Sequence, residues 1–380
     1  MAQVLQGLKV VEQGSFITGP AAAVFLADLG AEVIKIEQPG TGDPFRAFKG
    51  GLYSPQFQAY NRNKKSICLD TRVPADLEVF DKIIGDADVY IQNFRPATAE
   101  KLNVGAERLK GINDKLIYCA ISGFGKSGPA SNRPVYDTVA QAVSGFLNLL
   151  LHPLQPRVVG PAMADAITGF YAAYGILGAL YERQSTGKGR VVDISMLEAV
   201  SHFNVDAFTH YFANGEVMGP LSRPSVSQSY AVRCGDGKLI ALHMSSPPKF
   251  WSGLAEAISK PGLLEDPRFS TREARIENYE ALSEELSAIF SERPRDEWLK
   301  LLAQHDVPFA PVYNVEEVLA DEQAKFLGLE ASVPGVDGNP FRTIRSPISY
   351  DGETTPVQSA PPELDQDRDD ILARYAAKQS

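Results

Sequence analysis

The first third of the sequence alternates short apolar runs with helical segments, and this alternation limits the possible folds more than any other feature. Apolar strands separated by helical segments are typical of βαβ units, in which each helix crosses back over a parallel sheet. The pattern therefore predicts an α/β fold with a parallel sheet. We expect strands at residues 8–12, 32–36, 66–69, 89–92 and 115–122, and helices at residues 20–29 and 75–85. Farther along the chain we expect a strand at residues 190–194 and a helix around residues 196–208.

A chain of 380 residues is long for one domain and favours two. Near residues 214–228 the composition changes to Gly, Pro and Ser, which is typical of a linker. After it, strands at residues 230–233 and 239–243 and three helices predict a smaller α+β domain. The predicted organisation is a large domain at 1–213, a linker at 214–228, a small domain at 229–320 and a loop-rich segment at 321–380 with a short final helix.

Composition restricts the class of protein. Hydrophobic content of 44% and charged content of 22% are typical of a soluble globular protein, and a net charge of −10 argues against a general nucleic-acid binder. The N-terminus carries no signal-peptide pattern. Cys68, Cys119 and Cys234 are widely spaced and fit a reduced, cytoplasmic protein. The five histidines make no metal-ligand spacing, so we expect no metal site.

Asp165 is the only charged side chain between Arg157 and Glu182. A carboxylate among small and apolar residues is costly to bury, which makes Asp165 the strongest candidate for a catalytic role. A helix N-cap is the structural alternative, and the two are compatible because a helix N-terminus favours an ionised carboxylate. Residues 162–181 are apolar enough to suggest a membrane span, but Asp165 and three glycines favour a buried helix.

Residues 122–129 contain a G-x-G-x-x-G pattern after an expected strand. A dinucleotide site would need a helix to begin there and an acidic residue about 20 positions later. Pro129 and Pro134 follow instead, and residues 140–151 contain no acid. The pattern therefore favours a tight loop at the carboxyl end of a strand, where open α/β sheets bind ligands, with Gly123 as a candidate contact.

Five basic residues gather after the second expected strand of this acidic protein. Such side chains suit a phosphate-bearing ligand, although a solvated loop surface explains each of them singly. The set consists of Arg46, Arg62, Lys64, Lys65 and Arg72.

Taken together, these segments resemble family III coenzyme A transferases, which include formyl-CoA transferase, carnitine CoA-transferase and the related α-methylacyl-CoA racemases. The resemblance runs nearly end to end, and its order and spacing are specific. It includes Ala27-Asp-Leu-Gly-Ala-Glu-Val-Ile-Lys-Ile-Glu37, Asn61-Arg-Asn-Lys-Lys-Ser66, Gln92-Asn-Phe-Arg-Pro96 and Ala164-Asp165, with further matches at residues 7–12, 19–20, 42–46, 122–125, 136–137 and 186–198.

The resemblance implies that N- and C-terminal segments build the Rossmann-like large domain and that two chains interlock as a homodimer. It implies a nucleophilic role for Asp165, which would pass through a mixed anhydride and an aspartyl-CoA thioester. Acyl-CoA and a carboxylic acid would be the substrates, with coenzyme A as a substrate moiety rather than a permanently bound cofactor. The positions that match coenzyme A contacts are Leu69, Arg72, Asn93, Phe94, Lys101 and Tyr136.

Several positions depart from formyl-CoA transferase. Gln38 replaces an arginine, Ile17 replaces a glutamine, and residues 245–248 replace a glycine-rich loop. The resemblance to formyl-CoA transferase therefore does not imply oxalate or formate as the substrate. Oxyanion donors are expected near residues 123–125 or 245–246. Arg157 is a candidate for holding a second carboxylate, and a surface loop position is its alternative.

Two other functions stay open. A racemase needs two acid/base groups, and Tyr136 stands where the racemases have one of them, a histidine. Tyrosine, with a pKa near 10, is a poor base at neutral pH, so the sequence favours transfer. A non-catalytic coenzyme A-binding protein is the second alternative.

Overall fold

The structure is a computed structural model that describes residues 3–49, 51–152, 154–245 and 247–376. The chain divides into two compact units. Unit 1 falls within Met1–Leu147, Val158–Val205 and Gly328–Ser380, and unit 2 comprises Asn148–Arg157 and Asp206–Leu327. The second unit therefore begins before the expected linker at 214–228. The C-terminal segment that returns to unit 1, which we call the return segment, begins at 328 rather than at 321.

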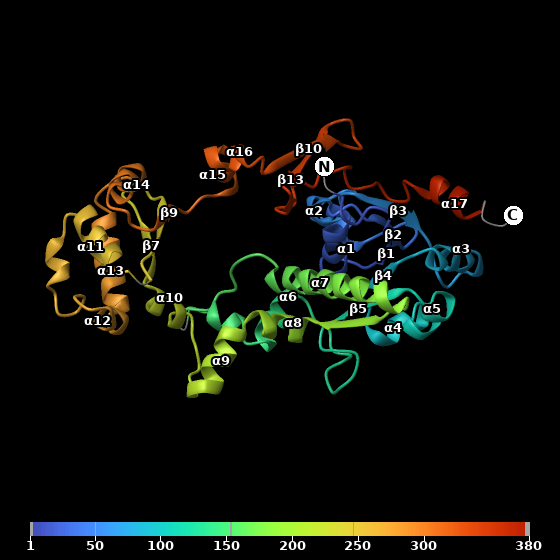
Figure 1. The fold of residues 1–380 in the computed structure, drawn as a ribbon, viewed down its shortest axis with the longest axis horizontal. Coiled ribbons are helices and arrows are strands. Elements are labelled where there is room, and N and C mark those ends of the chain that lie inside the picture. The colour runs from blue at the N-terminus through green and yellow to red at the C-terminus, as the bar shows by residue number, and fades with distance from the viewer. Residues whose placement is uncertain (1–2, 50, 153, 246, 377–380) are drawn as a thin grey trace. The chain divides into compact units, whose positions relative to one another are not determined.

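A parallel six-stranded sheet forms the centre of unit 1 (Figure 1). Its strand order is β3-β2-β1-β4-β5-β6, with every neighbouring pair parallel. Strands β2 and β3 therefore lie on one side of β1, and strands β4, β5 and β6 lie on its other side. The strands are β1 Lys9–Gln13, β2 Glu32–Glu37, β3 Lys64–Cys68, β4 Val89–Gln92, β5 Ile117–Ser122 and β6 Val191–Ser195.

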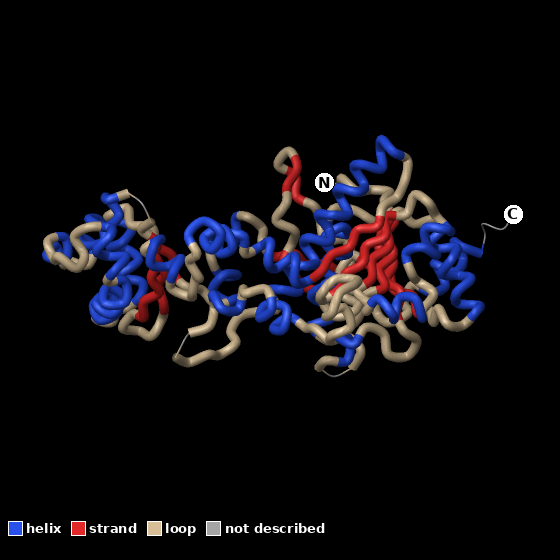
Figure 2. Tube along the Cα trace, turned by 90° about the horizontal axis from the view of Figure 1, so that it is seen from below, coloured by secondary structure: helices blue, strands red, loops and turns tan. Residues whose placement is uncertain are grey.

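Helices cover both faces of this sheet (Figure 2). Val10 packs in the cluster beneath α1 Thr18–Asp28 and α7 Met163–Thr186, whereas its neighbour Val11 packs in the opposite cluster. This alternation follows from the two-residue period of a strand, and it leaves the central strands buried on both faces. The opposite layer consists of α3 Pro74–Gly85, α4 Pro96–Lys101, α5 Ala106–Ile112 and α17 Arg368–Ala376.

The return segment attaches to the free edge of β3. Ser66 N donates to Asp367 Oδ2 over 2.8 Å, and Cys68 N donates to Asp365 Oδ1 over 2.6 Å. These bonds occupy backbone groups that an edge strand would otherwise leave unpaired. N-terminal and C-terminal segments therefore belong to one unit.

Helix α7 is, among the described residues, the helix long and apolar enough to cross a membrane by length and composition. That property is weak evidence, because core helices of soluble proteins share it. Its inner face packs on the sheet through Ala172 and Ile176. Phe170, Tyr174 and Tyr181 on the same helix are exposed.

Unit 1 also contains shorter elements that lie between the sheet strands or in the return segment. The antiparallel pair β10–β11 was not predicted, although Asp337-Gly338 between its strands is a hairpin turn signal. These elements are η1 Pro44–Ala47, α2 Pro55–Asn61, α6 Asp137–Val143, α8 Met196–Phe203, β10 Glu330–Pro334, β11 Pro340–Ile344, β12 Ser349–Tyr350 and β13 Glu353–Thr354. The short helix η2 Leu147–Leu149 spans the boundary with unit 2.

Unit 2 has its own core, in which a three-stranded antiparallel sheet packs against helices around Trp251, Phe290 and Trp298. Two expectations differ here. The single helix expected around 196–208 is interrupted at Asn204, and the expected linker contains a helix. The elements are α9 Val205–Asn214, α10 Ser222–Ser227, β7 Ser229–Arg233, β8 Leu239–His243, α11 Pro248–Ala257, η3 Pro261–Leu264, α12 Arg272–Glu277, α13 Tyr279–Phe290, α14 Arg295–Gln304, β9 Phe309–Pro311, α15 Val315–Ala320 and α16 Glu322–Phe326.

Two glycines of α7 allow a matched test of how closely α1 and α7 approach. A Cβ on Gly169 would lie 2.8 Å from Ala21 Cβ and 2.9 Å from Thr18 O, whereas Gly178 has open space. Gly169→Ala should lower the free energy of unfolding by about 1–3 kcal/mol because the helices must separate. Gly178→Ala should raise it by up to about 1 kcal/mol through helix propensity. Denaturant unfolding of both variants measures the difference, and equal effects would contradict the close packing.

Candidate active site

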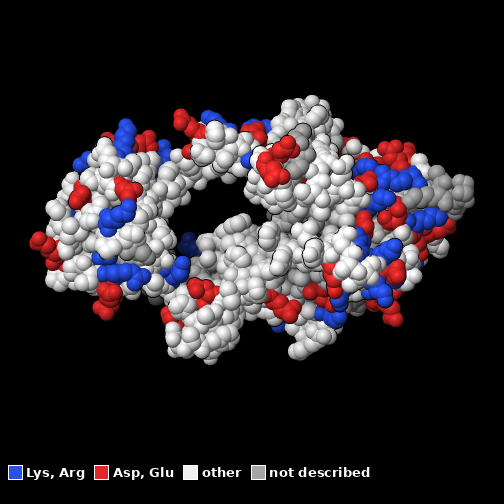
Figure 3. Space-filling model, viewed as in Figure 1, with Lys and Arg blue, Asp and Glu red and all other residues white. Residues whose placement is uncertain are grey.

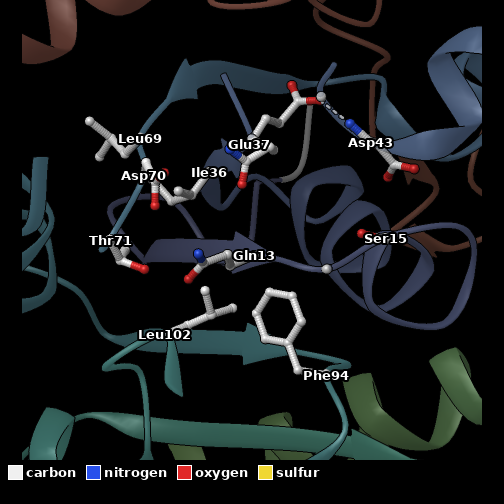
Figure 4. A pocket seen from close by; sticks show the side chains of 13 residues that line it. Gln13, Ser15, Ile36, Glu37, Asp43, Leu69, Asp70, Thr71, Phe94 and Leu102 are labelled. Carbon is white, nitrogen blue, oxygen red and sulfur yellow. Dashed lines mark hydrogen bonds between the residues drawn. The ribbon is translucent and has the colours of Figure 1, made fainter. Parts of the chain in front are cut away.

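A first cleft lies at the carboxyl ends of β1, β2 and β3, and we call it the β1–β3 cleft. Figure 4 shows its side chains, with Leu69 and Thr71 on one side and Phe94 and Leu102 on another. The place is expected, because open α/β sheets bind ligands outside the carboxyl ends of their strands where the strand order reverses. It is lined by Gln13, Gly14, Ser15, Ile36, Glu37, Gln38, Gly42, Asp43, Leu69, Asp70, Thr71, Phe94 and Leu102.

A second cleft, the Asp165 cleft, lies at the carboxyl ends of β1, β4 and β5. It encloses about 230 Å³ and shares Ser15 and Phe94 with the β1–β3 cleft. An elongated ligand can therefore contact both. It is lined by Ser15, Phe16, Ile17, Thr18, Asn93, Phe94, Arg95, Pro96, Ile121, Ser122, Gly123, Ser131, Arg133, Pro134, Val135, Tyr136, Asp165 and Met196.

Asp165 lies in the first turn of α7, but it does not cap that helix. The N-cap residue is Ala162, which makes no side-chain capping bond. The helix is capped instead by Asp137, whose Oδ1 accepts from Ala164 N over 2.8 Å and from Asp165 N over 3.2 Å. The Asp165 carboxylate is thus left to face the cleft.

Burial and the nearby Asp137 carboxylate raise the pKa of Asp165 to about 7. The sequence suggested the opposite direction, since a helix N-terminus favours an ionised carboxylate. Here desolvation and like-charge repulsion outweigh that effect. Asp165 is consequently a more basic carboxylate than usual, and it is ionised mainly above neutral pH.

Asp137 and Tyr60 do not line the cleft but interact with Asp165 or its charge, and we did not predict either of them. Asp137 is fixed by Gln141 Nε2, which donates to its Oδ2 over 2.6 Å. Burial, followed by the charges of Asp165 and Asp137, raises the pKa of Tyr60, so its phenol stays protonated near the two carboxylates. The sequence did contain a local signal for Asp137, because residues 136–137 are one of the segments that resemble the transferase family. Tyr60 had none, since α2 comes close only through the fold.

Most of the predicted coenzyme A contacts come together in the two clefts. Leu69 and Phe94 line the β1–β3 cleft, and Asn93, Phe94, Gly123 and Tyr136 line the Asp165 cleft. Two others lie elsewhere. Lys101 is exposed at the end of α4. Arg72 is exposed and donates to Asp70, a lining residue whose pKa it lowers to about 2.

Local contacts explain why Asn93 and Gly123 occupy these positions. Asn93 Oδ1 accepts from Ser15 N over 2.9 Å, and its Nδ2 donates to Ser15 O over 2.8 Å, so Asn93 ties the β4 end to the β1–α1 loop. A Cβ on Gly123 would lie 2.0 Å from Val135 Cγ1. Only glycine allows the chain to pass so close beneath the cleft.

The predicted basic cluster does not form an anion site, and Arg46 is not a ligand contact in this structure. Arg46 is fully buried, pairs with both carboxylate oxygens of Glu37 and donates to Pro362 O. The other four each find an acid as well: Arg72 pairs with Asp70 as described above, Arg62 with Asp28, Lys64 with Glu12 and Lys65 with Glu32. Spacing along the sequence could not show the last three acids, because they come from other strands and helices.

Two arginines that we did not single out lie in the Asp165 cleft. Arg95 precedes α4, and Arg133 stacks over the Phe124 ring at 5.1 Å from its centroid. Both are exposed, so their guanidinium groups can meet an anionic ligand. The cleft thus combines cations with a basic carboxylate.

The remaining predicted contacts belong to unit 2 or lie outside the described residues. Arg157 is exposed in unit 2. Ser245 also belongs to unit 2, and Ser246 lies outside the described residues. Across the part of the chain that is described, no group of three or more His, Cys, Asp or Glu could hold a metal ion.

The family model described as CoA-transferase family III matches residues 5–368. The chain belongs to CoA-transferase family III. It is 33% identical to acetyl-CoA:oxalate CoA-transferase from Acetobacter aceti, over 88% of each chain. It is 32% identical to succinyl-CoA–D-citramalate CoA-transferase from Chloroflexus aurantiacus, over 83% of this chain and 80% of that enzyme. A CAIB/BAIF family protein from Brucella suis superposes with a TM-score of 0.87 at 31% identity, over 99% of this chain and 100% of the other.

The raised pKa of Asp165 predicts a pH-dependent stability in this family III chain. A carboxyl with a folded pKa near 7 and an ordinary unfolded pKa near 4 stabilises the fold while protonated, and this stability is lost as pH rises towards 7. Asp165→Asn should therefore exceed the wild type in unfolding free energy at pH 8 by roughly 2–4 kcal/mol more than at pH 4. Urea unfolding at both pH values tests this.

The matched control is Asp114→Asn, at an exposed carboxylate of the same unit. The control should show no comparable rise. A pH-independent difference for Asp165→Asn would contradict the raised pKa.

Proposed function

We propose that this protein transfers coenzyme A from an acyl-CoA to a carboxylic acid, with Asp165 as the covalent nucleophile. The observation that carries the proposal is a single basic carboxylate facing a cleft that continues into a second cleft at the switch point of the sheet. Membership of CoA-transferase family III supports the reaction class.

In this proposal coenzyme A lies across the two clefts, which share Ser15 and Phe94. Its nucleotide would occupy the β1–β3 cleft beside Leu69 and Thr71, and its pantetheine chain would pass Phe94 to bring the thioester to Asp165. Arg95 and Arg133 are positioned to meet phosphate groups through charge-assisted hydrogen bonds. Coenzyme A enters as part of the substrate rather than as a resident cofactor.

The first half of the reaction frees the donor acid. An Asp165 carboxylate oxygen attacks the thioester carbonyl, the carbon–sulfur bond breaks, and coenzyme A leaves as a thiolate from a mixed anhydride. The thiolate then attacks the Asp165 carbonyl carbon. The donor leaves as a carboxylate, and an aspartyl-CoA thioester remains.

The second half runs the same steps with the acceptor. The acceptor carboxylate attacks the aspartyl thioester and releases the thiolate, which then attacks the acceptor carbonyl of the new anhydride. Product acyl-CoA forms and the Asp165 carboxylate is regenerated. No proton is consumed overall, so a carboxylate with a raised pKa suits the reaction above neutral pH by its greater basicity.

The intermediates need shelter from water and a donor for each oxyanion. Of the two predicted donor sets, residues 123–125 are the one that contributes to the Asp165 cleft, through Gly123. Binding energy from the distant nucleotide would hold the thiolate between steps.

We propose a dicarboxylic acid as the acceptor. The relatives named above act on oxalate and D-citramalate, with acetyl-CoA and succinyl-CoA as the paired thioesters. A human relative, 31% identical over 86% of this chain and 75% of that enzyme, is named succinyl-CoA:glutarate CoA-transferase. The buried thiols Cys68, Cys119 and Cys234 fit the cytoplasm as the setting.

We also propose a homodimer. The outer face of α7 exposes Phe170, Tyr174 and Tyr181, and few charged side chains lie over this helix (Figure 3). Large exposed aromatic faces mark interaction sites. A second copy of the chain is the partner that the resemblance to interlocked transferases implies.

The racemase alternative lacks its histidine base, because Tyr136 occupies that position in the Asp165 cleft. Incubation of an acyl-CoA in heavy water separates the two reactions: a racemase incorporates deuterium at the α-carbon, and transfer requires none.

Asp165→Ala should lose at least about 10³-fold in transfer rate, because the nucleophile is absent while the fold remains. The assay follows coenzyme A exchange between succinyl-CoA or acetyl-CoA and a panel of dicarboxylic acids by mass spectrometry. Asp114→Ala, at an exposed site, should retain full activity. Substantial transfer by Asp165→Ala would refute the nucleophile, and a wild type that exchanges no pair would refute the function.

A further inference from the structure

Four ionisable side chains lie fully buried beneath the loop that joins β1 to α1, residues 14–17. The four come from three neighbouring strands and from the turn after β2, so they meet only in the folded sheet. They are Glu12, Lys35, Asp43 and Lys64.

The four charges neutralise one another. Glu12 lies 3.0 Å from Lys35 and 3.1 Å from Lys64, and Asp43 Oδ2 lies 3.1 Å from Lys35 Nζ. Burial alone would lower the pKa of Lys35, but Glu12 and Asp43 outweigh it and raise that pKa, so the ammonium stays charged. Buried ion pairs are often no more stabilising than apolar residues of similar volume. Fold stability is therefore a weak explanation for this network.

The network does bond directly to the backbone of the loop. Gly14 N donates to Glu12 Oε1 over 2.6 Å, and Lys35 Nζ donates to Gly14 O over 3.0 Å. Asp43 Oδ1 accepts from Phe16 N over 3.1 Å. These bonds fix both ends of the loop to charged groups that cannot move without leaving a buried charge unpaired.

The loop needs such restraint. Phe16 has φ +63°, in the left-handed region, which costs a non-glycine residue about 1 kcal/mol or more. Ser15 lines both clefts, and Phe16 lines the Asp165 cleft, where its ring contacts Tyr136 at 5.8 Å between centroids. A relaxed loop would change the shape of the surface on which the ligand lies.

We infer that Glu12, Lys35, Asp43 and Lys64 form a positioning network that holds the strained 14–17 loop in the conformation that binds the coenzyme A part of the substrate. The inference rests on the proposed function for the identity of the ligand. It assigns these residues no contact with the reacting atoms.

The charge-neutral paired variant Lys35→Met/Asp43→Ala tests the network. Glu12 and Lys64 still pair in it, so no buried charge is left alone, and urea unfolding should still show a cooperatively folded protein. The dissociation constant for coenzyme A, measured by calorimetric titration, should rise about tenfold or more because Gly14 O and Phe16 N lose their bonds to the network. The control is Arg183→Met, which removes the ion pair with Asp88 at the amino ends of the strands. The control should bind coenzyme A as the wild type does.

A folded paired variant with wild-type affinity would overturn the inference. If that variant does not fold, Asp43→Ala alone decides. It removes the acceptor of Phe16 N and leaves Lys35 paired with Glu12. An unchanged dissociation constant overturns the inference, and a rise of about threefold supports it. Binding is read separately from transfer. A wild type that binds coenzyme A but transfers nothing contradicts the proposed function and not the network, and one that does not bind it contradicts both.

Discussion

The reversal of strand order between β1 and β4 is the constraint on which the rest of unit 1 depends. Because the chain builds outward on both sides of β1, the loops after β1 and β4 diverge and leave a crevice at their carboxyl ends. Ser15 and Asn93 face each other across it and are hydrogen-bonded. Both clefts open from this point, so one topological feature sets the path of an elongated ligand.

Desolvation then gives the crevice its chemistry. Asp137 uses its carboxylate to cap α7, and the same negative charge, with burial, raises the pKa of Asp165. A capping residue and the proposed nucleophile are thus coupled across two helices. The buried network under the β1–α1 loop shows the opposite arrangement, in which charges are paired so that a backbone is held.

Much of the fold could be predicted because short apolar strands and amphipathic helices are local patterns. Each strand of the parallel sheet begins and ends within a few residues of its expected bounds. Asp165 was also identifiable, since an isolated charge in an apolar run is visible in sequence. Arg46 was misjudged for the converse reason: its partner Glu37 lies near in sequence, but only the fold shows that the pair is buried against the return segment. Tyr60 and Arg133 reach the site through tertiary packing and left no local signal.

The central claim is that Asp165 becomes covalently acylated during turnover. Hydroxylamine added with acyl-CoA should convert the activated carboxyl of Asp165 to a hydroxamate, which mass spectrometry would locate in the tryptic peptide 158–183, where Asp165 is the only aspartate. The account predicts the modification on Asp165 and its absence when acyl-CoA is omitted. An unmodified peptide from a protein that is turning over, or a hydroxamate on Asp137 instead, would contradict it.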